Sequence, residues 1–249
     1  PSAGTTSSTP AAVDADPAVS LATGESPRSE PVRPVPESGA PEVTVEFGGR
    51  DFDSVWQSRG ASLATLNLLD YSPSETDTSA LPLLGAVDGP VGNFLLRDLN
   101  GRFALDRVHW QVEKQETGGG LARLVFTHDT GEGLVFRRIV TEHNAPYTFD
   151  MRLEVENVGA ERSANLSLAL QGPRGVVDEE AGSKWYGAPT ALAVIDRANV
   201  EEAEVVRWSG RDLGDDGVSV GDGDRLVAAG SMVTYFTSVV VPSPETDVR

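Results

Sequence analysis

The chain has 249 residues, among them 38 Asp or Glu, 20 Lys or Arg and no cysteine. Its formal net charge of −18 disfavours nucleic acids and anionic lipid headgroups as partners, because binding to either requires a basic surface. The absence of cysteine excludes disulfides, thiol nucleophiles and cysteine-based zinc sites. The longest apolar runs are far shorter than the roughly 20 residues of a membrane-spanning helix, so we expect a soluble chain.

The first segment of the sequence, Pro1 to Pro41, differs sharply from the rest. It holds half of the prolines, and no aromatic residue occurs before Phe47. Such a segment buries too little apolar surface to offset the entropy of ordering it. We therefore expect residues 1–41 to be a disordered linker. Because methionine occurs only at Met151 and Met232, we also expect the chain to be part of a longer protein.

From residue 43 onward, apolar and polar residues alternate with the period of two that is typical of β-strands. Residues 43–47 form the first such stretch, and residues 147–155 form the clearest one. In the latter, we expect Phe149, Met151, Leu153 and Val155 to be buried, and Arg152 and Glu154 to be exposed. A turn at 157–160 and renewed alternation at 166–170 predict an antiparallel partner for this strand.

Two further strand pairs are predicted around glycine-rich turns. Residues 121–128 and 134–141 flank a turn at 129–133, and the three glycines at 118–120 connect residue 112 to Leu121 as another hairpin. The short apolar run 191–195 also favours a strand.

No amphipathic helix is apparent, and the loops at 73–92, 172–182 and 210–223 are rich in Gly, Pro, Asp and Ser. Many short strands joined by such loops are typical of a large antiparallel β-sandwich, with more strands than an immunoglobulin domain. The sequence therefore predicts an all-β domain over residues 42–249.

The three histidines do not form a catalytic or metal-binding pattern. His109 and His128 lie in predicted strands, and His143 lies in a predicted turn. Their spacing matches no metal motif, and neither a phosphate-binding loop nor a nucleophile elbow occurs in the sequence. We therefore predict no catalytic, cofactor-binding or metal-binding residue and no cofactor.

Carboxylates are dense at 178–180 and 212–224, where repeated Asp-Gly pairs invite a calcium-site interpretation. These stretches lack the register of an EF-hand and its closing Glu, so we expect solvated acidic loops. The tryptophans, which might line a sugar site, are expected to belong to the core. They are Trp56, Trp110, Trp185 and Trp208.

Three stretches together resemble the large periplasmic domain of YidC membrane-protein insertases. The first combines the strand 43–47, the Gly-containing turn 58–63 and the Leu-Leu-Asp-Tyr sequence 68–71. The second combines Leu-Val-Phe-Arg-Arg-Ile-Val at 134–140 with the strand that starts at Tyr147 and ends in Val-Glu-Asn-Val-Gly at 155–159. The third is the strand Tyr-Phe-Thr-Ser-Val-Val-Val-Pro at 235–242. The order and spacing of these stretches are similar to those of the family.

This resemblance implies a galactose-mutarotase-like super-sandwich of antiparallel strands, preceded by a linker to a first transmembrane helix. It implies a non-catalytic periplasmic accessory domain of a Gram-negative inner-membrane protein, in contact with Sec translocon subunits or membrane-protein clients. We expect this domain to be a monomer. Family members continue past the Tyr-Phe strand, so we expect residues 42–249 to lack the last elements of the domain.

The alternative is a mutarotase-type carbohydrate-active enzyme or a sugar-binding sandwich of the same fold. A sugar epimerase needs a general acid and a general base that face one cleft, typically His and Glu. The three histidines of this sequence lack the Asn-His context of a mutarotase. The accessory domain is therefore the preferred interpretation.

Overall fold

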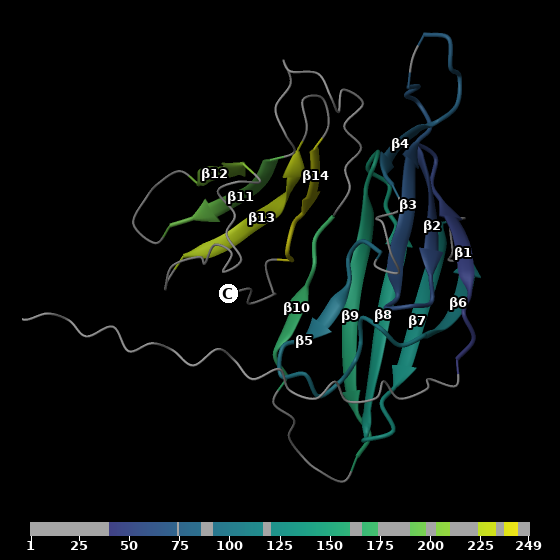
Figure 1. Cartoon of the computed structure of the whole chain (residues 1–249), viewed down its shortest axis with the longest axis vertical. Coiled ribbons are helices and arrows are strands. Elements are labelled where there is room, and N and C mark those ends of the chain that lie inside the picture. Colours follow the sequence, from purple (N-terminus) through teal and green to yellow (C-terminus); the bar gives the residue numbers. More distant parts are fainter. Residues whose placement is uncertain are drawn as a thin grey trace, which may run out of the picture. The chain divides into compact units, whose positions relative to one another are not determined.

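The computed structural model is all-β in the residues that it describes, and its strands form antiparallel sheets (Figure 1). These residues are 40–73, 75–85, 92–116, 121–159, 166–173, 190–197, 203–209, 224–232 and 237–243. The predicted fold class, an antiparallel β-sandwich, is confirmed. The predicted linker up to residue 39, the acidic stretches 178–180 and 212–223 and the Tyr-Phe pair at 235–236 lie outside these residues. Pro41 and Asp224 are described.

The first sheet contains four strands in sequence order: β1 (Thr44–Gly48), β2 (Phe52–Gln57), β3 (Ser62–Leu68) and β4 (Leu81–Leu84). Burial alternates along β2, as expected for a strand that covers a core with one face. Phe52 and Trp56 are on its buried face. The sequence prediction of a strand at 43–47 is confirmed within one residue.

The turn between β2 and β3 depends on a glycine. Gly60 has a φ of 62°, and a Cβ at this position would lie 2.6 Å from the Leu95 side chain and 2.9 Å from the Asp106 carbonyl oxygen. Ala61 follows with a φ of 48°. A left-handed backbone in a space this tight is accessible to glycine and to few other residues. The Gly-containing turn that carries part of the family resemblance is therefore a steric requirement of this fold.

Ser58, which directly precedes this turn, fixes the point where the chain enters β1. Its hydroxyl oxygen accepts a hydrogen bond from the Val43 amide at 2.9 Å and lies 3.2 Å from the Pro41 carbonyl oxygen. The Ser58 amide donates to the Val43 carbonyl at 2.8 Å. Because Ser58 is fully buried, these contacts hold residues 41–43 against the body of the domain.

The second sheet also runs in sequence order, with β6 (Gln111–Glu116), β7 (Ala122–Asp129), β8 (Leu134–Glu142) and β9 (Phe149–Asn157). The pairing of β7 with β8 and of β6 with β7 confirms both predicted hairpins. The strand predicted at 147–155 is β9, and it pairs with β8 along its whole length.

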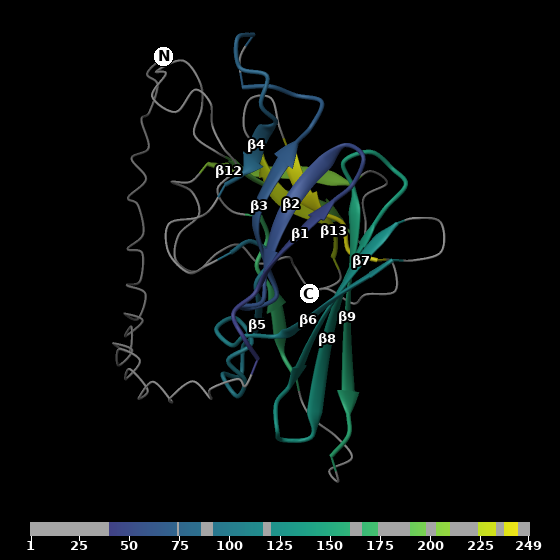
Figure 2. The same cartoon turned by 90° about the vertical axis from the view of Figure 1, so that its right-hand side faces the viewer.

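The first and second sheets lie against each other (Figure 2). Together they enclose an aromatic core. The ring of Trp56 lies 6.0 Å from that of Phe126 and 5.8 Å from that of Phe149, measured between centroids. Trp110 packs against Phe136 at 6.4 Å. Edge-to-face and tilted pairs of this kind add about 0.5–1.5 kcal/mol each to the free energy of burial. The prediction that the tryptophans belong to the core is confirmed for Trp56 and Trp110. Trp208 in β12 is only half-buried and is not part of this core, and Trp185 lies outside the described residues.

The predicted burial of β9 is only half right. Phe149 and Met151 are half-buried against the core, whereas Leu153 and Val155 are each 39% exposed. Arg152 is exposed as predicted, and Glu154 is half-buried instead of exposed. The predicted alternation of burial therefore holds for residues 149–152 and fails in the second half of β9, the last strand of its sheet.

The predicted pairing of residues 147–155 with 166–170 is wrong. The strand β10 (Leu168–Leu170) pairs instead with β5 (Leu96–Asp98), a short strand from the middle of the chain. Alternation and a turn predict strands that are neighbours in sequence, but they do not identify the partner. In the structure, β9 pairs with β8 along its whole length, and β10 joins β5 in a separate two-stranded sheet.

A third sheet has the order β12-β11-β13-β14 and is formed by β11 (Thr190–Asp196), β12 (Glu204–Ser209), β13 (Arg225–Met232) and β14 (Thr237–Val240). The predicted strand at 191–195 is therefore confirmed as β11. Val240 packs against the main core and so connects β14 to the first two sheets.

Candidate functional site

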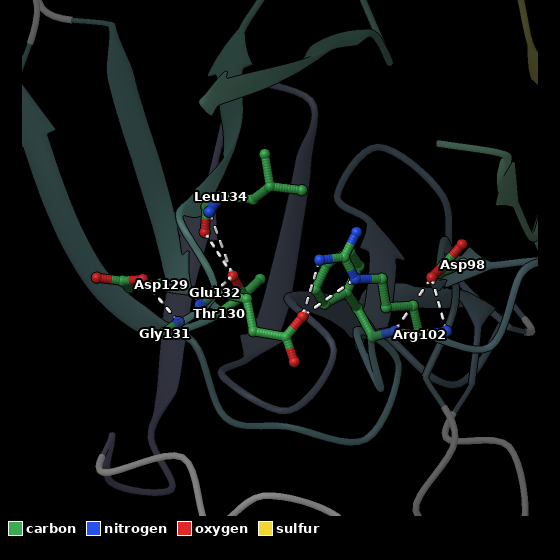
Figure 3. Close-up of polar contacts among 8 residues, drawn as sticks. Asp98, Arg102, Asp129, Thr130, Gly131, Glu132 and Leu134 are labelled. Carbon is green, nitrogen blue, oxygen red and sulfur yellow. Dashed lines mark hydrogen bonds and ion pairs between the residues drawn. The ribbon is translucent and has the colours of Figure 1, made fainter. Parts of the chain in front are cut away.

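Figure 3 shows polar contacts in two segments, the loop that starts at Asp98 at the end of β5 and the turn between β7 and β8. The Asp98 carboxylate accepts backbone hydrogen bonds from Asn100 at 3.0 Å, Arg102 at 2.9 Å and Phe103 at 3.1 Å. Asp98 is buried, and each of its carboxylate oxygens has at least one backbone partner. Its role is therefore to fold the loop after β5 and not to act on a ligand.

Arg102 connects this loop to the turn between β7 and β8. Its guanidinium lies 3.0 Å from Glu132 and stacks on the Phe103 ring with its central carbon 4.9 Å from the ring centroid. Thr130 shapes the same turn by donating to the Leu134 carbonyl at 3.0 Å (Figure 3). Both partners of the ion pair are well exposed, so it contributes about 1 kcal/mol or less. Together, the contacts of Asp98 and Arg102 fix the position of the loop after β5.

The three histidines lie in three different environments. His109 forms an isolated bridge with Arg59 outside the strands, contrary to prediction, and its Nδ1 lies 3.0 Å from the Ser58 hydroxyl. His128 is in β7 as predicted and packs on Trp110, and burial lowers its pKa below the ordinary value. His143 is in the predicted turn, where Nδ1 accepts from the Ala145 amide at 2.9 Å. The structure does not bring the histidines together.

Within the described residues, no group of three or more His, Cys, Asp or Glu side chains is placed to hold a metal ion. The same part of the chain contains no helix of the length and hydrophobicity needed to cross a membrane. Asp224, at the end of the second acidic stretch, forms an ion pair with Arg197 at 2.8 Å. Because Arg197 follows β11 and Asp224 precedes β13, this ion pair stabilises the end of the third sheet at which these two strands pair.

An apolar cavity of about 600 Å³ is lined by residues of β3, β4, β9 and β14. Its floor is formed by side chains of β3, β4 and the aromatic core, including Leu66, Leu68, Leu84 and Phe94. One wall comprises the residues from Tyr147 to Met151 at the start of β9, and the other comprises residues 237–241 of β14. Volumes of roughly 300–1,000 Å³ with apolar walls are typical of ligand sites.

Two tyrosines lie at the rim of this cavity. Tyr71 follows β3, Tyr147 precedes β9, and their ring centroids are 5.9 Å apart. They are 46% and 42% exposed, respectively. The Tyr147 hydroxyl donates a hydrogen bond to the Asp70 carboxylate at 3.0 Å, and this bond raises the pKa of Tyr147 to about 12.

Sequence reasoning did not identify this rim as a site. In the sequence, Leu-Leu-Asp-Tyr at 68–71 is part of the family resemblance, and Tyr147 is the first residue of the strand predicted at 147–155. In the structure, Tyr147 precedes β9 and adopts a φ of 56°, which is rare for a residue that is not glycine. Strand alternation does not indicate the contact between Tyr71 and Tyr147, because the two residues lie in loops that are far apart in sequence.

A second feature that the sequence did not reveal is a buried arginine. Arg138 lies on the core face of β8, where its guanidinium donates to the Ala61 carbonyl at 2.7 Å. Burial lowers the pKa of Arg138 to about 10. In the sequence, Arg138 is a charged residue within a mainly apolar strand. In the structure, it connects the second sheet to the turn between β2 and β3.

Comparison with known proteins agrees with the architecture of the chain. A family model described as the YidC periplasmic domain matches residues 50–249, which is most of the sequence. No curated protein matches the chain. The match covers all strands from β2 onward, including those whose motifs resemble the family. The chain therefore belongs to the family of YidC periplasmic domains.

Proposed function

We propose that this protein is a non-catalytic accessory domain of a YidC-type insertase in the inner membrane of a Gram-negative bacterium. Its role is to assist membrane-protein insertion and folding through contacts with Sec translocon subunits or with client chains. The family match over residues 50–249 is the observation that carries this proposal. The proposal also includes residues 1–41 as a linker and 42–249 as the domain, which acts as a monomer without a cofactor.

The side chains around the cavity support a binding role over a catalytic one. Sugar epimerisation needs a general acid and a general base facing one cleft. No histidine is among the described residues that line the cavity, and the carboxylate among them is Asp150. Asp70 is not one of the lining residues, and its carboxylate accepts a hydrogen bond from Tyr147. Apolar walls and exposed tyrosines are typical of surfaces that bind proteins.

The test is to delete residues 42–249 from the parent protein while keeping its membrane segments. We expect insertion of simple clients to continue and recovery of Sec components in pull-downs to fall. A matched control deletes residues 1–41 alone, which should leave Sec recovery higher than in the domain deletion. Complete loss of insertion by an abundant, folded deletion protein would contradict the accessory role.

The catalytic alternative is tested separately by polarimetry on freshly dissolved aldoses. We expect mutarotation at the uncatalysed rate in the presence of the domain. Acceleration that is lost on replacing His109 or His143 would instead support a sugar enzyme.

A further inference from the structure

The two walls of the apolar cavity are strand edges. Successive side chains of a strand point to opposite faces of its sheet. Where consecutive residues of one strand line a cavity, the strand therefore presents its edge to that cavity. Residues 147–151 and 237–241 are both such walls. β9 is the last strand of the second sheet and β14 is the last strand of the third, and no further strand pairs with either edge in the described part of the chain.

The charges around the cavity are predominantly negative. Asp150 lines it, and the fields of Asp70 and Asp51 both reach the Tyr147 phenol. Two cations flank this part of the chain and both are paired, Arg50 with Asp51 and Arg152 with Glu154, each at 3.1 Å. Neither lysine nor arginine is among the described residues that line the cavity. The faces of Tyr71 and Tyr147 add sites that attract cations.

We propose that this cavity binds an extended segment of another polypeptide, with apolar side chains at alternate positions and a lysine or arginine beside them. The segment adds a strand to the edge of β9 or β14, places its apolar side chains over Leu66, Leu68 and Leu84, and sets its basic residue near Asp150. Strand addition supplies affinity through the backbone, and the cavity and the charge supply selectivity. This inference rests on the proposed function and specifies the chemistry of the client segment.

The test uses the whole chain and a fluorescein-labelled peptide of about nine residues, with leucine at alternate positions and lysine at both ends. Anisotropy at low salt should show saturable binding that weakens as salt rises. A peptide with the same leucines but with glutamate ends should bind at least about tenfold more weakly. Equal binding of the two peptides would overturn the proposed charge selectivity.

Two pairs of variants locate the site. Asp150→Lys reverses the charge at the cavity, and Glu113→Lys makes the same change on exposed β6, at the opposite edge of the same sheet. Val239→Trp fills the cavity from an exposed position, and Val205→Trp adds the same bulk on β12, at the opposite edge of the third sheet. Asp150→Lys and Val239→Trp should each weaken binding about tenfold, and their controls should change it less than twofold.

Hydrogen exchange then distinguishes strand addition from simple insertion of an apolar group. Bound peptide should slow amide exchange in residues 149–151 or 237–240. A peptide with proline at the positions between the leucines should bind weakly, because proline lacks the N–H that a strand ladder requires. Equal binding of the proline peptide, or competition by a detergent monomer without amide protection, would show that the cavity takes an apolar small molecule and would overturn the proposal.

Loss of Sec recovery in the domain deletion, together with no peptide binding, would refute this site while leaving the accessory role standing.

Discussion

The phenol of Tyr147 and the carboxylate of Asp70 are joined by a hydrogen bond of 3.0 Å between residues that are 77 positions apart in sequence. This bond connects the end of the first sheet, after β3, to the start of β9 in the second. Tyr147 lines the cavity, and this contact holds its ring beside that of Tyr71, at 5.9 Å between centroids.

This bond makes the ionisation of Tyr147 a direct measure of rim geometry. The hydrogen bond to Asp70 is the main cause that raises the pKa of Tyr147 to about 12, above the ordinary value of about 10. Asp70→Asn should return the pKa toward 10, as followed by ultraviolet absorbance of tyrosinate. Tyr147→Phe should remove the high-pH phase, which assigns it to this residue. An unchanged titration curve for Asp70→Asn would contradict the contact.

The sign of the linked stability effect follows from the raised pKa. The folded state holds the phenol proton more tightly than the unfolded chain, so the contribution of the bond is present below about pH 10. It is lost as the pH rises through about 12. Comparison of the unfolding midpoints of the wild type and Tyr147→Phe across this range checks the direction.

His128 should make the domain sensitive to acid. Burial lowers the pKa of His128, so the unfolded chain binds a proton at this position more readily than the folded domain does. The free energy of unfolding should therefore fall as the pH drops below about 6.5, the ordinary value for histidine. His128→Asn should remove this part of the acid dependence. An NMR titration midpoint for His128 at or above 6.5 would refute the assignment.

Leucines on β7 and β9, the two strands that flank β8, should differ strongly in their contribution to stability. Leu124 is fully buried, so Leu124→Ala should cost about 2–5 kcal/mol in the free energy of unfolding. Leu153 is 39% exposed, and Leu153→Ala should cost about 1 kcal/mol or less. Urea denaturation of the two variants provides the measurement. Equal costs would mean that the second half of β9 is covered in solution.

Gly230 should be intolerant of any side chain. A Cβ at this position would lie 2.0 Å from the Ser238 carbonyl oxygen, so β13 and β14 would have to separate. Gly230→Ala should therefore destabilise the domain by about 1–3 kcal/mol. Gly172→Ala is the matched control, because a Cβ there meets no atom within 4 Å. Thermal unfolding of the pair checks the difference, and identical melting temperatures would contradict the β13–β14 register.

The individual strands could be predicted from sequence because alternation is a local property. β7, β8 and β9 carry it, whereas β11 carries a short apolar run, and the predicted ranges of all four strands agree with the structure within one or two residues. The hairpins around residues 117–121 and 129–133 were equally accessible, since the turn residues are adjacent to the strands they join.

Non-local relationships could not be predicted in the same way. The pairing of β10 with β5 joins strands about 70 residues apart, and nothing in either strand specifies its partner. The alternating pattern in the sequence identifies the face of β9 on which Leu153 lies. It does not identify whether other parts of the chain cover that face, and this decides how far Leu153 is buried. For the same reason, the cavity between β9 and β14 became apparent only when their edges were placed in space.

The anchoring of the chain at Ser58 has a mechanical consequence. A load applied along β1 from the residues before Pro41 meets the contacts of Ser58 with Pro41 and Val43, and then the ladder between β1 and β2. Antiparallel ladder bonds lie perpendicular to their strands, so a pull along the strand axis loads them in shear and all at once. Tension on this end of the domain is therefore shared by the whole β1–β2 interface and does not open it one bond at a time.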